Sequence, residues 1–259
     1  MTSTLIPRLI SIPVSHYCEK VRWAMEWLEI PYVEERHVPL IHRFYTRQVG
    51  GSSVPVLVTQ TATFIDSADI LHHLDDMTSS DKRLYPNNPE LRRQIDQLED
   101  TFNHQLAPHV RCWGYFNGFQ DWGLMQTVWC DGVPGWERAL FPFVFPLVRR
   151  KARKAYNINF ESAIASLDQI QQIFDVIGSR LADGRKYLVG DDFSAADLTF
   201  ACLAAPTLFP PEYGVPFPQL DSIPSQMADQ IQVFRETPAG KYVLRLYRQR
   251  QSLLKYSHT

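Results

Sequence analysis

The sequence has few cysteines, no long apolar run and no excess of positive charge. Its 259 residues include four cysteines, scattered at positions 18, 112, 130 and 202. They form no metal-type pair, and they suit a reducing compartment. No run approaches the roughly 18 uninterrupted apolar residues of a membrane-spanning helix. The net charge of −2 leaves no polycationic footprint, so nucleic acid is not an expected partner.

The N-terminus also lacks the basic region and the apolar region of a secretory signal. It reads MTSTLIPRL, so we expect a soluble, cytoplasmic protein without a transmembrane segment. With 45% hydrophobic and 21% charged residues, the chain can bury a core. Its length is comfortable for two packed domains.

The stretch from Leu9 to Tyr32 combines a short strand, a turn and a helix. Apolar residues recur at spacings of three and four on one face of that helix: Val21, Ala24, Met25 and Leu28. Ser15 lies in the turn, and Cys18 follows where the strand gives way to the helix. Backbone N–H groups are unpaired at a helix start and the helix dipole is positive there. Such a position stabilises an anion, including a thiolate.

Two further motifs follow in the first third of the chain. Val54-Pro55 opens a strand-like run, and because proline cannot donate to a central ladder, the bond before it is the natural candidate for a cis peptide. Asp66-Ser67 precedes a helical pattern and predicts an N-terminal cap. Unpaired N–H groups and a hydroxyl there suit a carboxylate, while the Asp66 side chain can meet an ammonium group.

These motifs together resemble the glutathione S-transferase superfamily, in its serine-type classes. Ser-His-Tyr-Cys at 15–18 takes the place of the Cys-x-x-Cys of thioredoxin-like redox proteins. The resemblance implies that Ser15 hydrogen-bonds the sulfur of glutathione, which is a co-substrate. It also implies a cis bond before Pro55, pairing of the Val54 backbone with the cysteinyl part of glutathione, and contacts from Asp66 and Ser67 to its γ-glutamyl group.

One expected feature of the family is weak in this sequence. Many relatives have a lysine just before Val-Pro, where this chain has Ser52-Ser53. The contact to the glycine carboxylate of glutathione would then fall to residues of the short helix at 40–48, and Arg43 and Gln48 are the candidates, beside His42 and Arg47. Charged residues on a short helix are more often a solvated face.

The resemblance also supplies the fold class, α/β plus all-α. It implies a thioredoxin-like glutathione-binding domain over residues 1–78, with the order β-α-β-α-β-β-α. Residues 79–89 form a polar linker, and residues 90–259 form an all-helical bundle domain. Members of the family commonly form homodimers, so a homodimer is the expected assembly.

The second half of the chain contains several helical patterns. A long pattern over 90–119 contains Pro108, which should kink or divide it. Residues 121–148 are the least regular part, whereas 160–181 and 237–251 read as helices. Ser194 and Asp197 form a capping box, to which we assign a structural role.

The resemblance places the pocket for the second, electrophilic substrate in the helical domain, near the least regular part. Candidate apolar walls are Trp113, Tyr115, Phe116, Phe119 and Trp122. The apolar run 139–148 with the basic cluster after it also allows a helix on a membrane surface. Prolines argue against that hypothesis, because they interrupt a continuous amphipathic helix.

The predicted chemistry requires only a modest stabilisation of the glutathione thiolate by the protein. Lowering a thiol pKa from about 8.5 by about two units requires roughly 2.7 kcal/mol. One charge-assisted hydrogen bond from Ser15 and the helix start supply this amount. The bound thiolate then attacks a hydrophobic electrophile, and proximity contributes the remainder.

Two other functions remain open from the sequence. Cys18 allows thiol-disulfide or deglutathionylation chemistry, although the nucleophile's usual place in such motifs holds Ser15. A non-catalytic member that only binds glutathione or another ligand is the second alternative, because a fold does not fix a function. No metal site is expected, since His72 and His73 are adjacent and face different directions on a helix.

Overall fold

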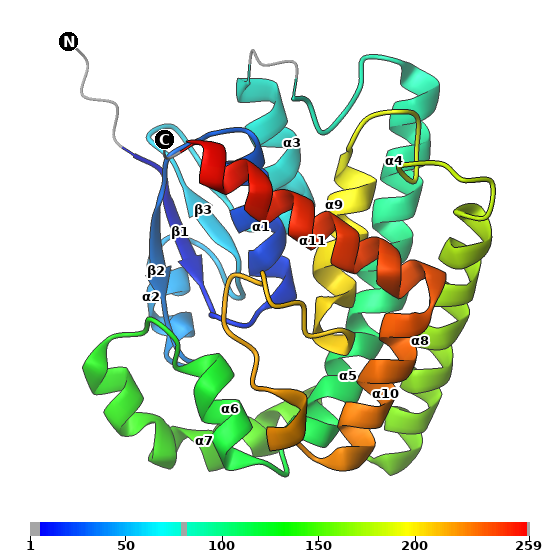
Figure 1. The fold of residues 1–259 in the computed structure, drawn as a ribbon. Coiled ribbons are helices and arrows are strands. Elements are labelled where there is room, and N and C mark those ends of the chain that lie inside the picture. Colours follow the sequence, from blue (N-terminus) through cyan, green and yellow to red (C-terminus); the bar gives the residue numbers. More distant parts are fainter. Residues whose placement is uncertain (1–5, 79–81, 258–259) are drawn as a thin grey trace.

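The chain folds into a small mixed-sheet domain followed by a helical domain, which confirms the expected fold class (Figure 1). The computed structural model describes residues 6–78 and 82–257. The domain limits at 1–78 and 90–259 stay a prediction, and residues 1–5, 79–81 and 258–259 of the predicted domains and linker lie outside the described residues. No helix in the described part of the chain is both long enough and apolar enough to cross a membrane.

Four short strands form the sheet, in the order β2-β1-β3-β4. They are β1 (Arg8–Ser11), β2 (Val33–Arg36), β3 (Val56–Val58) and β4 (Thr63–Phe64). β1 pairs with β2 in parallel and with β3 in antiparallel orientation, and β3 pairs antiparallel with β4. Leu9 and Leu57 are register partners and are both fully buried, so the central strands carry the core of this domain.

Three helices accompany the sheet: α1 (His16–Trp27), α2 (His42–Gln48) and α3 (Ser67–Met77). The predicted apolar face of α1 is buried. α1 and α3 pack on each other between the sheet and the helical domain, and α1 also contacts α9 (Figure 1). The helix that begins after Ser15 therefore lies at the centre of the molecule, between the two domains.

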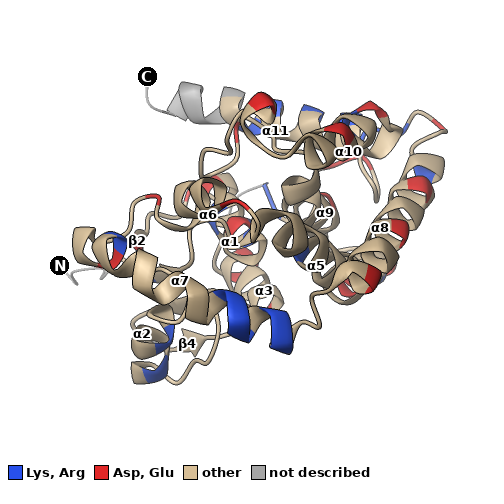
Figure 2. Ribbon diagram, turned by 90° about the horizontal axis from the view of Figure 1, so that it is seen from below, with Lys and Arg blue, Asp and Glu red and all other residues tan. Residues whose placement is uncertain are grey.

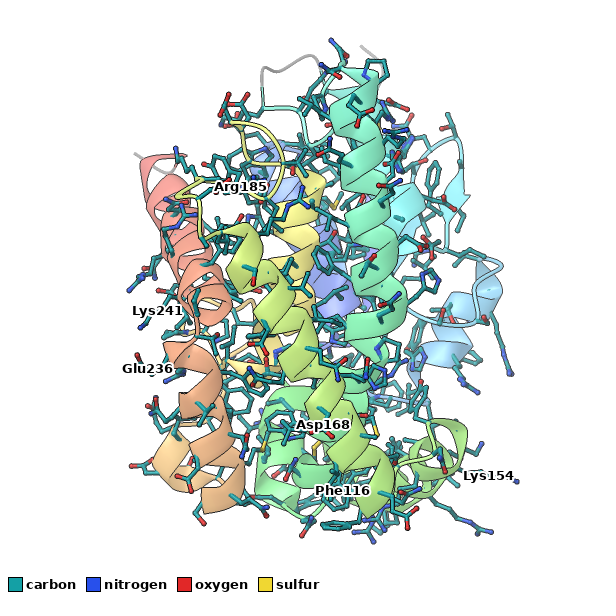
Figure 3. All side chains as sticks on the ribbon, turned by 90° about the vertical axis from the view of Figure 1, so that its right-hand side faces the viewer. Phe116, Lys154, Asp168, Arg185, Glu236 and Lys241 are labelled. Atoms are coloured by element: carbon teal, nitrogen blue, oxygen red, sulfur yellow. The ribbon has the colours of Figure 1, made fainter. Side chains whose placement is uncertain are left out.

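The remaining elements are helical. They are α4 (Pro89–Thr101), a π-helical turn η1 (Phe102–Leu106), α5 (Ala107–Gly118), α6 (Trp122–Trp129), α7 (Gly135–Ala155), α8 (Phe160–Arg180), α9 (Ala195–Ala204), the 3₁₀ turns η2 (Ala205–Thr207) and η3 (Leu220–Ser222), α10 (Ser225–Glu236) and α11 (Pro238–Ser257). The kink or division predicted at Pro108 is confirmed as an irregularity, because the π-helical turn ends at Leu106 and α5 begins at Ala107, one residue before the proline. Figure 3 shows α8 along the length of this domain, with α10 and α11 beside it.

The segment 121–148, predicted as irregular, instead forms helix α6 and most of helix α7, so that prediction was wrong. Pro142 and Pro146 lie inside α7, four residues apart. Both are exposed, whereas Phe141, Phe145 and Val148 form the buried stripe. The carbonyls that lose a helical partner therefore belong to solvent-exposed residues, where water can bond them. The objection that prolines prevent a continuous helix at this surface does not hold, and a membrane-surface role for α7 stays an untested hypothesis.

The capping box at Ser194 and Asp197 is confirmed and anchors the buried helix α9. The carboxylate of Asp197 accepts hydrogen bonds from the N–H of Ser194 at 2.8 Å and the N–H of Leu188 at 2.7 Å. Tyr242 of α11 also donates to it. A wholly buried carboxylate needs several donors to be tolerated, so this box ties three segments of the helical domain together.

Candidate functional site

Two cavities meet at the start of α1. The larger has a volume of about 650 Å³ and is lined by residues of both domains, and the smaller has a volume of about 430 Å³. Four residues line both: Tyr17, Ser53, Val54 and Arg111. A ligand with two arms can therefore reach both spaces past this junction.

Ser15 is the N-cap of α1 and lies on the wall of the larger cavity. Its hydroxyl oxygen accepts a hydrogen bond from the N–H of Cys18 at 3.4 Å. A hydroxyl that accepts can still donate its own proton. The structure thus places a hydrogen-bond donor and the positive end of a helix dipole at one point of the cavity wall.

Both domains hold the turn before Ser15. The Arg22 guanidinium of α1 donates to the carbonyl of Pro13 at 2.8 Å. The hydroxyl of Tyr213, from the helical domain, donates to the carbonyl of Val14 at 3.1 Å. Because these contacts come from opposite sides, the position of the Ser15 hydroxyl depends on how the two domains pack.

Val54 lies at the junction of the cavities, and Pro55 follows it on the wall of the smaller one. The peptide bond between them is cis. Val54 lines both cavities, whereas Pro55 lines the smaller one. The structure therefore brings Val54 to the same junction as Tyr17, two residues beyond Ser15.

Asp66 and Ser67 lie on the wall of the smaller cavity, at the start of α3. Asp66 is the N-cap, and its Oδ1 accepts from the N–H of Ala68 at 2.7 Å and the N–H of Asp69 at 3.3 Å. Further carboxylates from α4 line the same cavity: Asp96, Glu99 and Asp100. This concentration of negative charge suits a cationic group of a ligand.

The two candidates on α2 separate in the structure. Arg43 lines the larger cavity, together with His42, whereas Gln48 lines neither cavity and is exposed at the far end of the helix. The prediction for Gln48 is therefore not supported by its position, because five residues of helix turn it away from the site. Burial lowers the pKa of His42 to about 4, so its ring is neutral at pH 7.

Among the predicted aromatic walls, only Tyr115 lines the larger cavity. Trp113, Phe116 and Phe119 line neither cavity, and neither does Trp122, so their positions do not support these predictions. The lining residues of α5 recur at helical spacing and define one face: Val110, Arg111, Gly114, Tyr115 and Gly118. Trp113 and Phe116 project from the other side of α5, and Phe119 stacks behind Tyr115 at a ring separation of 4.9 Å.

Most of the apolar wall comes from residues that the sequence reasoning missed. They belong to α6, α7, the segment between α9 and α10, and α10 itself: Leu124, Met125, Val128, Trp129, Val148, Pro206, Phe209, Phe217 and Met227. The spacing of 124, 125, 128 and 129 is a helical signal that could have revealed the face of α6. No local sequence pattern indicates that the segment around Phe217 lies against this cavity.

Cys18, the candidate redox residue, is fully buried. Burial raises the pKa of its thiol to about 11, although the nearby Arg22 and the Ser15 hydroxyl offset part of this effect. The thiolate is the reactive species of cysteine, and it is scarce at such a pKa. Cys18 also lines neither cavity, so its position does not support a redox role.

His72, Asp96 and Glu99 come together beside the smaller cavity, with ligand atoms within 4.8 Å of one another. Positively charged side chains already contact two of these residues. Lys20 lies 3.4 Å from Glu99, and an Arg92 N–H group lies 3.3 Å from His72 Nδ1. Glu99 also accepts from Tyr85 at 2.5 Å, so this group is an ion-pair and hydrogen-bond network that joins α1 to α4.

Comparison with known proteins agrees with this architecture. Residues 9–81 match the family model "Glutathione S-transferase, N-terminal domain", and residues 150–224 match "Glutathione S-transferase, C-terminal domain". These matches together cover more than half of the sequence, and the chain belongs to the glutathione S-transferase superfamily. A curated relative, glutathione S-transferase 3 of Schizosaccharomyces pombe, is 24% identical over 185 residues, which are 69% of this chain and 65% of that protein. The chain thus spans just under two thirds of that relative's length.

Solved structures share the fold at low sequence identity. Ure2p in complex with glutathione superposes with a TM-score of 0.61 at 14% identity, covering 98% of this chain and 94% of Ure2p. The β-etherase LigF from Sphingobium sp. strain SYK-6 gives 0.59 at 15% identity, covering 93% and 99%. The Tau class glutathione S-transferase of mango, Mangifera indica, gives 0.54 at 15% identity, covering 98% and 99%. At these identities the likeness concerns the fold.

Proposed function

We propose that the protein is a glutathione transferase in which Ser15 holds glutathione as a thiolate for attack on an electrophile in the larger cavity. The observation that carries this proposal is the position of Ser15. It caps α1 and lies on the wall of a cavity whose other walls come from the helical domain. A sulfur placed there meets both a hydroxyl donor and a helix start.

The two cavities fit the two ends of glutathione. The smaller cavity offers Asp66 for the γ-glutamyl ammonium group and the start of α3 for its carboxylate. Val54, at the junction, offers its backbone to the cysteinyl part. Arg43, on the wall of the larger cavity, is the candidate partner for the glycine carboxylate. A family relationship to glutathione transferases supports the same assignment.

Ser15 acts by stabilising charge, and it forms no covalent bond. In the reaction the thiolate sulfur forms a bond to an electrophilic carbon, and the leaving group departs with its electron pair or the substrate takes up a proton. A hydrogen bond to an ionised group contributes about 1.5–3 kcal/mol. That range matches a fall of about one to two units in the thiol pKa.

The test is the ultraviolet absorbance of the thiolate of bound glutathione, titrated from pH 5 to 9. In the wild type we expect a bound-thiol pKa well below the ordinary value of about 8.5. Ser15→Ala should raise this pKa by about one to two units and lower kcat/KM by about 10- to 1000-fold. Ser15→Thr, which keeps the hydroxyl, should retain both properties.

Ser15→Asp is the matched control for the helix cap. An aspartate preserves capping of α1 but donates no hydrogen bond and adds a negative charge, so it should raise the thiol pKa further. An unshifted thiol pKa in all variants would contradict the role of Ser15. Glutathione binding without turnover of any electrophile would indicate a non-catalytic binding protein.

A further inference from the structure

The larger cavity is charged with one sign only. Its described walls include Arg43, Arg111, Lys151 and Lys154 and no aspartate or glutamate. None of these four side chains makes an ion pair or a side-chain hydrogen bond with another described residue. Acidic residues instead line the smaller cavity. The two cavities are therefore of opposite electrostatic character.

Arg111 is the most constrained of these cations. It extends from α5 to the junction of the two cavities, and its guanidinium lies 4.2 Å from the centre of the Tyr156 ring. Its Nε is buried and has no hydrogen-bond partner within the described chain. A buried donor without an acceptor is unfavourable, so the described chain leaves part of the hydrogen-bonding capacity of this guanidinium unused.

On the side of the larger cavity, the neighbours of Arg111 supply no negative charge. His16, beside it, has its pKa lowered to about 3 by burial and by Arg111 and Lys20, so it is neutral at pH 7. The pKa of Tyr115 is raised to about 12 by burial, although Arg111 opposes this, so its phenol is also neutral. The larger cavity therefore offers no carboxylate to Arg111, and the acidic residues near it line the smaller cavity.

The rest of the cavity determines the shape of the ligand. Beyond Arg111 the walls of α6 and of the segment after α9 are apolar. At the rim, the basic end of α7 contributes Lys151 and the exposed Lys154, and Figure 2 shows Lys and Arg gathered at this end of the helix and on α2. In Figure 3 Lys154 lies at the edge of the molecule. A positive rim attracts anions before they enter.

We propose that the electrophile taken by the larger cavity is an organic anion, with an apolar body and a carboxylate or sulfonate group that pairs with Arg111. This inference rests on the proposed function and names the substrate class for the same site. A planar guanidinium binds a carboxylate through two parallel N–H donors, and a low local dielectric strengthens the pair. The apolar body fills the wall formed by α6.

A matched pair of electrophiles tests the charge directly. 4-Chloro-3-nitrobenzoate and 4-chloro-3-nitrobenzamide both react with a thiolate, whose sulfur bonds to the ring carbon while chloride leaves with the electron pair. Each kcat/KM is divided by the rate constant of the same compound with glutathione in buffer. The wild type should favour the benzoate by about 10-fold or more, and Arg111→Gln should bring the ratio close to one.

Arg149→Gln is the matched control. Arg149 also lies over an aromatic ring, that of Phe145 at 5.6 Å, but it lines neither cavity. It should keep the wild-type preference. At the rim, Lys151→Gln compared with Arg150→Gln removes the same charge one residue apart, and only the first should weaken the preference. An Arg111→Gln variant that slows both compounds equally and raises KM for glutathione would overturn the inference and assign Arg111 to the glutathione site.

A binding measurement separates this inference from the proposed function. Without glutathione, the fluorescence of 8-anilinonaphthalene-1-sulfonate should report binding that Arg111→Gln weakens by about 10-fold. The neutral N-phenyl-1-naphthylamine should bind both proteins equally. If this pattern holds while no electrophile is turned over, the transferase proposal fails and the anion-binding cavity stands. If the two dyes respond alike to Arg111→Gln, the inference fails whatever the activity.

Discussion

Arg250 on α11 lies 2.5 Å from Glu19 on α1, and both side chains are buried. Arg22 pairs with the same carboxylate at 3.0 Å, and the N–H of Gly214 donates to it at 3.0 Å. Burial alone would raise the pKa of Glu19, but the two guanidinium groups hold it below its usual value. The last helix is thus joined electrostatically to the helix that begins at the candidate catalytic serine.

Loss of Arg250 should destabilise the protein strongly. Arg250→Met leaves the Glu19 carboxylate buried with only part of its compensation, and removal of one partner of a buried pair costs about 3–5 kcal/mol. Urea unfolding measures the change. Lys241→Met is the control, because Lys241, also on α11, pairs in solvent with Glu236 at the end of α10, at 3.0 Å (Figure 3). That variant should lose less than about 1 kcal/mol. Equal losses in the two variants would contradict a structural role for the buried pair.

The parts of the fold and site that the sequence predicted are those governed by local chemistry. Ser15, Asp66 and the Ser194–Asp197 box each follow from a polar residue at a helix start, which short-range capping explains. These contacts involve residues only two or three positions apart. Long-range packing does not disturb such signals.

The parts that failed depend on tertiary structure. An aromatic residue on α5 can face either the cavity or the core, and only the packing of α6 and α8 decides which. Arg250 and Glu19 are 231 residues apart in the sequence, and no local pattern predicts that they pair. The prolines of α7 suggested a break in the helix, whereas both face solvent and the helix continues past them. In each case the outcome depends on which side chains are buried in the folded chain, and residue type predicts burial only statistically.

Cys18 should be unreactive in the folded protein. With a thiol pKa of about 11 and no exposed surface, only about one molecule in a thousand carries the thiolate at pH 8. The other cysteines, at 112, 130 and 202, are buried as well. A disulfide reagent such as 5,5′-dithiobis(2-nitrobenzoate) should therefore react slowly with the native protein. After unfolding, it should react with all four thiols. Cys18→Ala should keep the transferase activity, and rapid modification of Cys18 that abolishes activity would restore the redox alternative.

His16 should make the protein less stable in mild acid. Burial, with Arg111 and Lys20, lowers its folded-state pKa to about 3 from an unfolded value of 6.5. The unfolded chain therefore binds a proton that the folded chain rejects, and stability present above pH 6.5 is lost as the pH falls toward 3. Between pH 7 and pH 5 this single group accounts for about 2 kcal/mol. His16→Gln should remove that part of the pH dependence in urea unfolding, and parallel stability curves for the two proteins would refute the assignment.

Gly114 offers a way to change the cavity without disturbing the core. It lies inside α5 on the cavity wall, and a Cβ added there meets no atom within 4 Å. Gly114→Ala should raise stability by about 0.5–1 kcal/mol, because glycine is a poor helix residue and no contact is lost. Gly114→Leu should keep much of that gain while its side chain fills space beside Tyr115. We therefore expect a higher KM for bulky electrophiles and an unchanged KM for glutathione.

Gly118 supplies the contrast, since a Cβ there would lie 2.8 Å from the Met125 sulfur, so Gly118→Ala should bring a smaller gain in stability or a loss. If Gly114→Leu instead impaired glutathione and electrophile equally, the larger cavity would not be the space in which the second substrate binds.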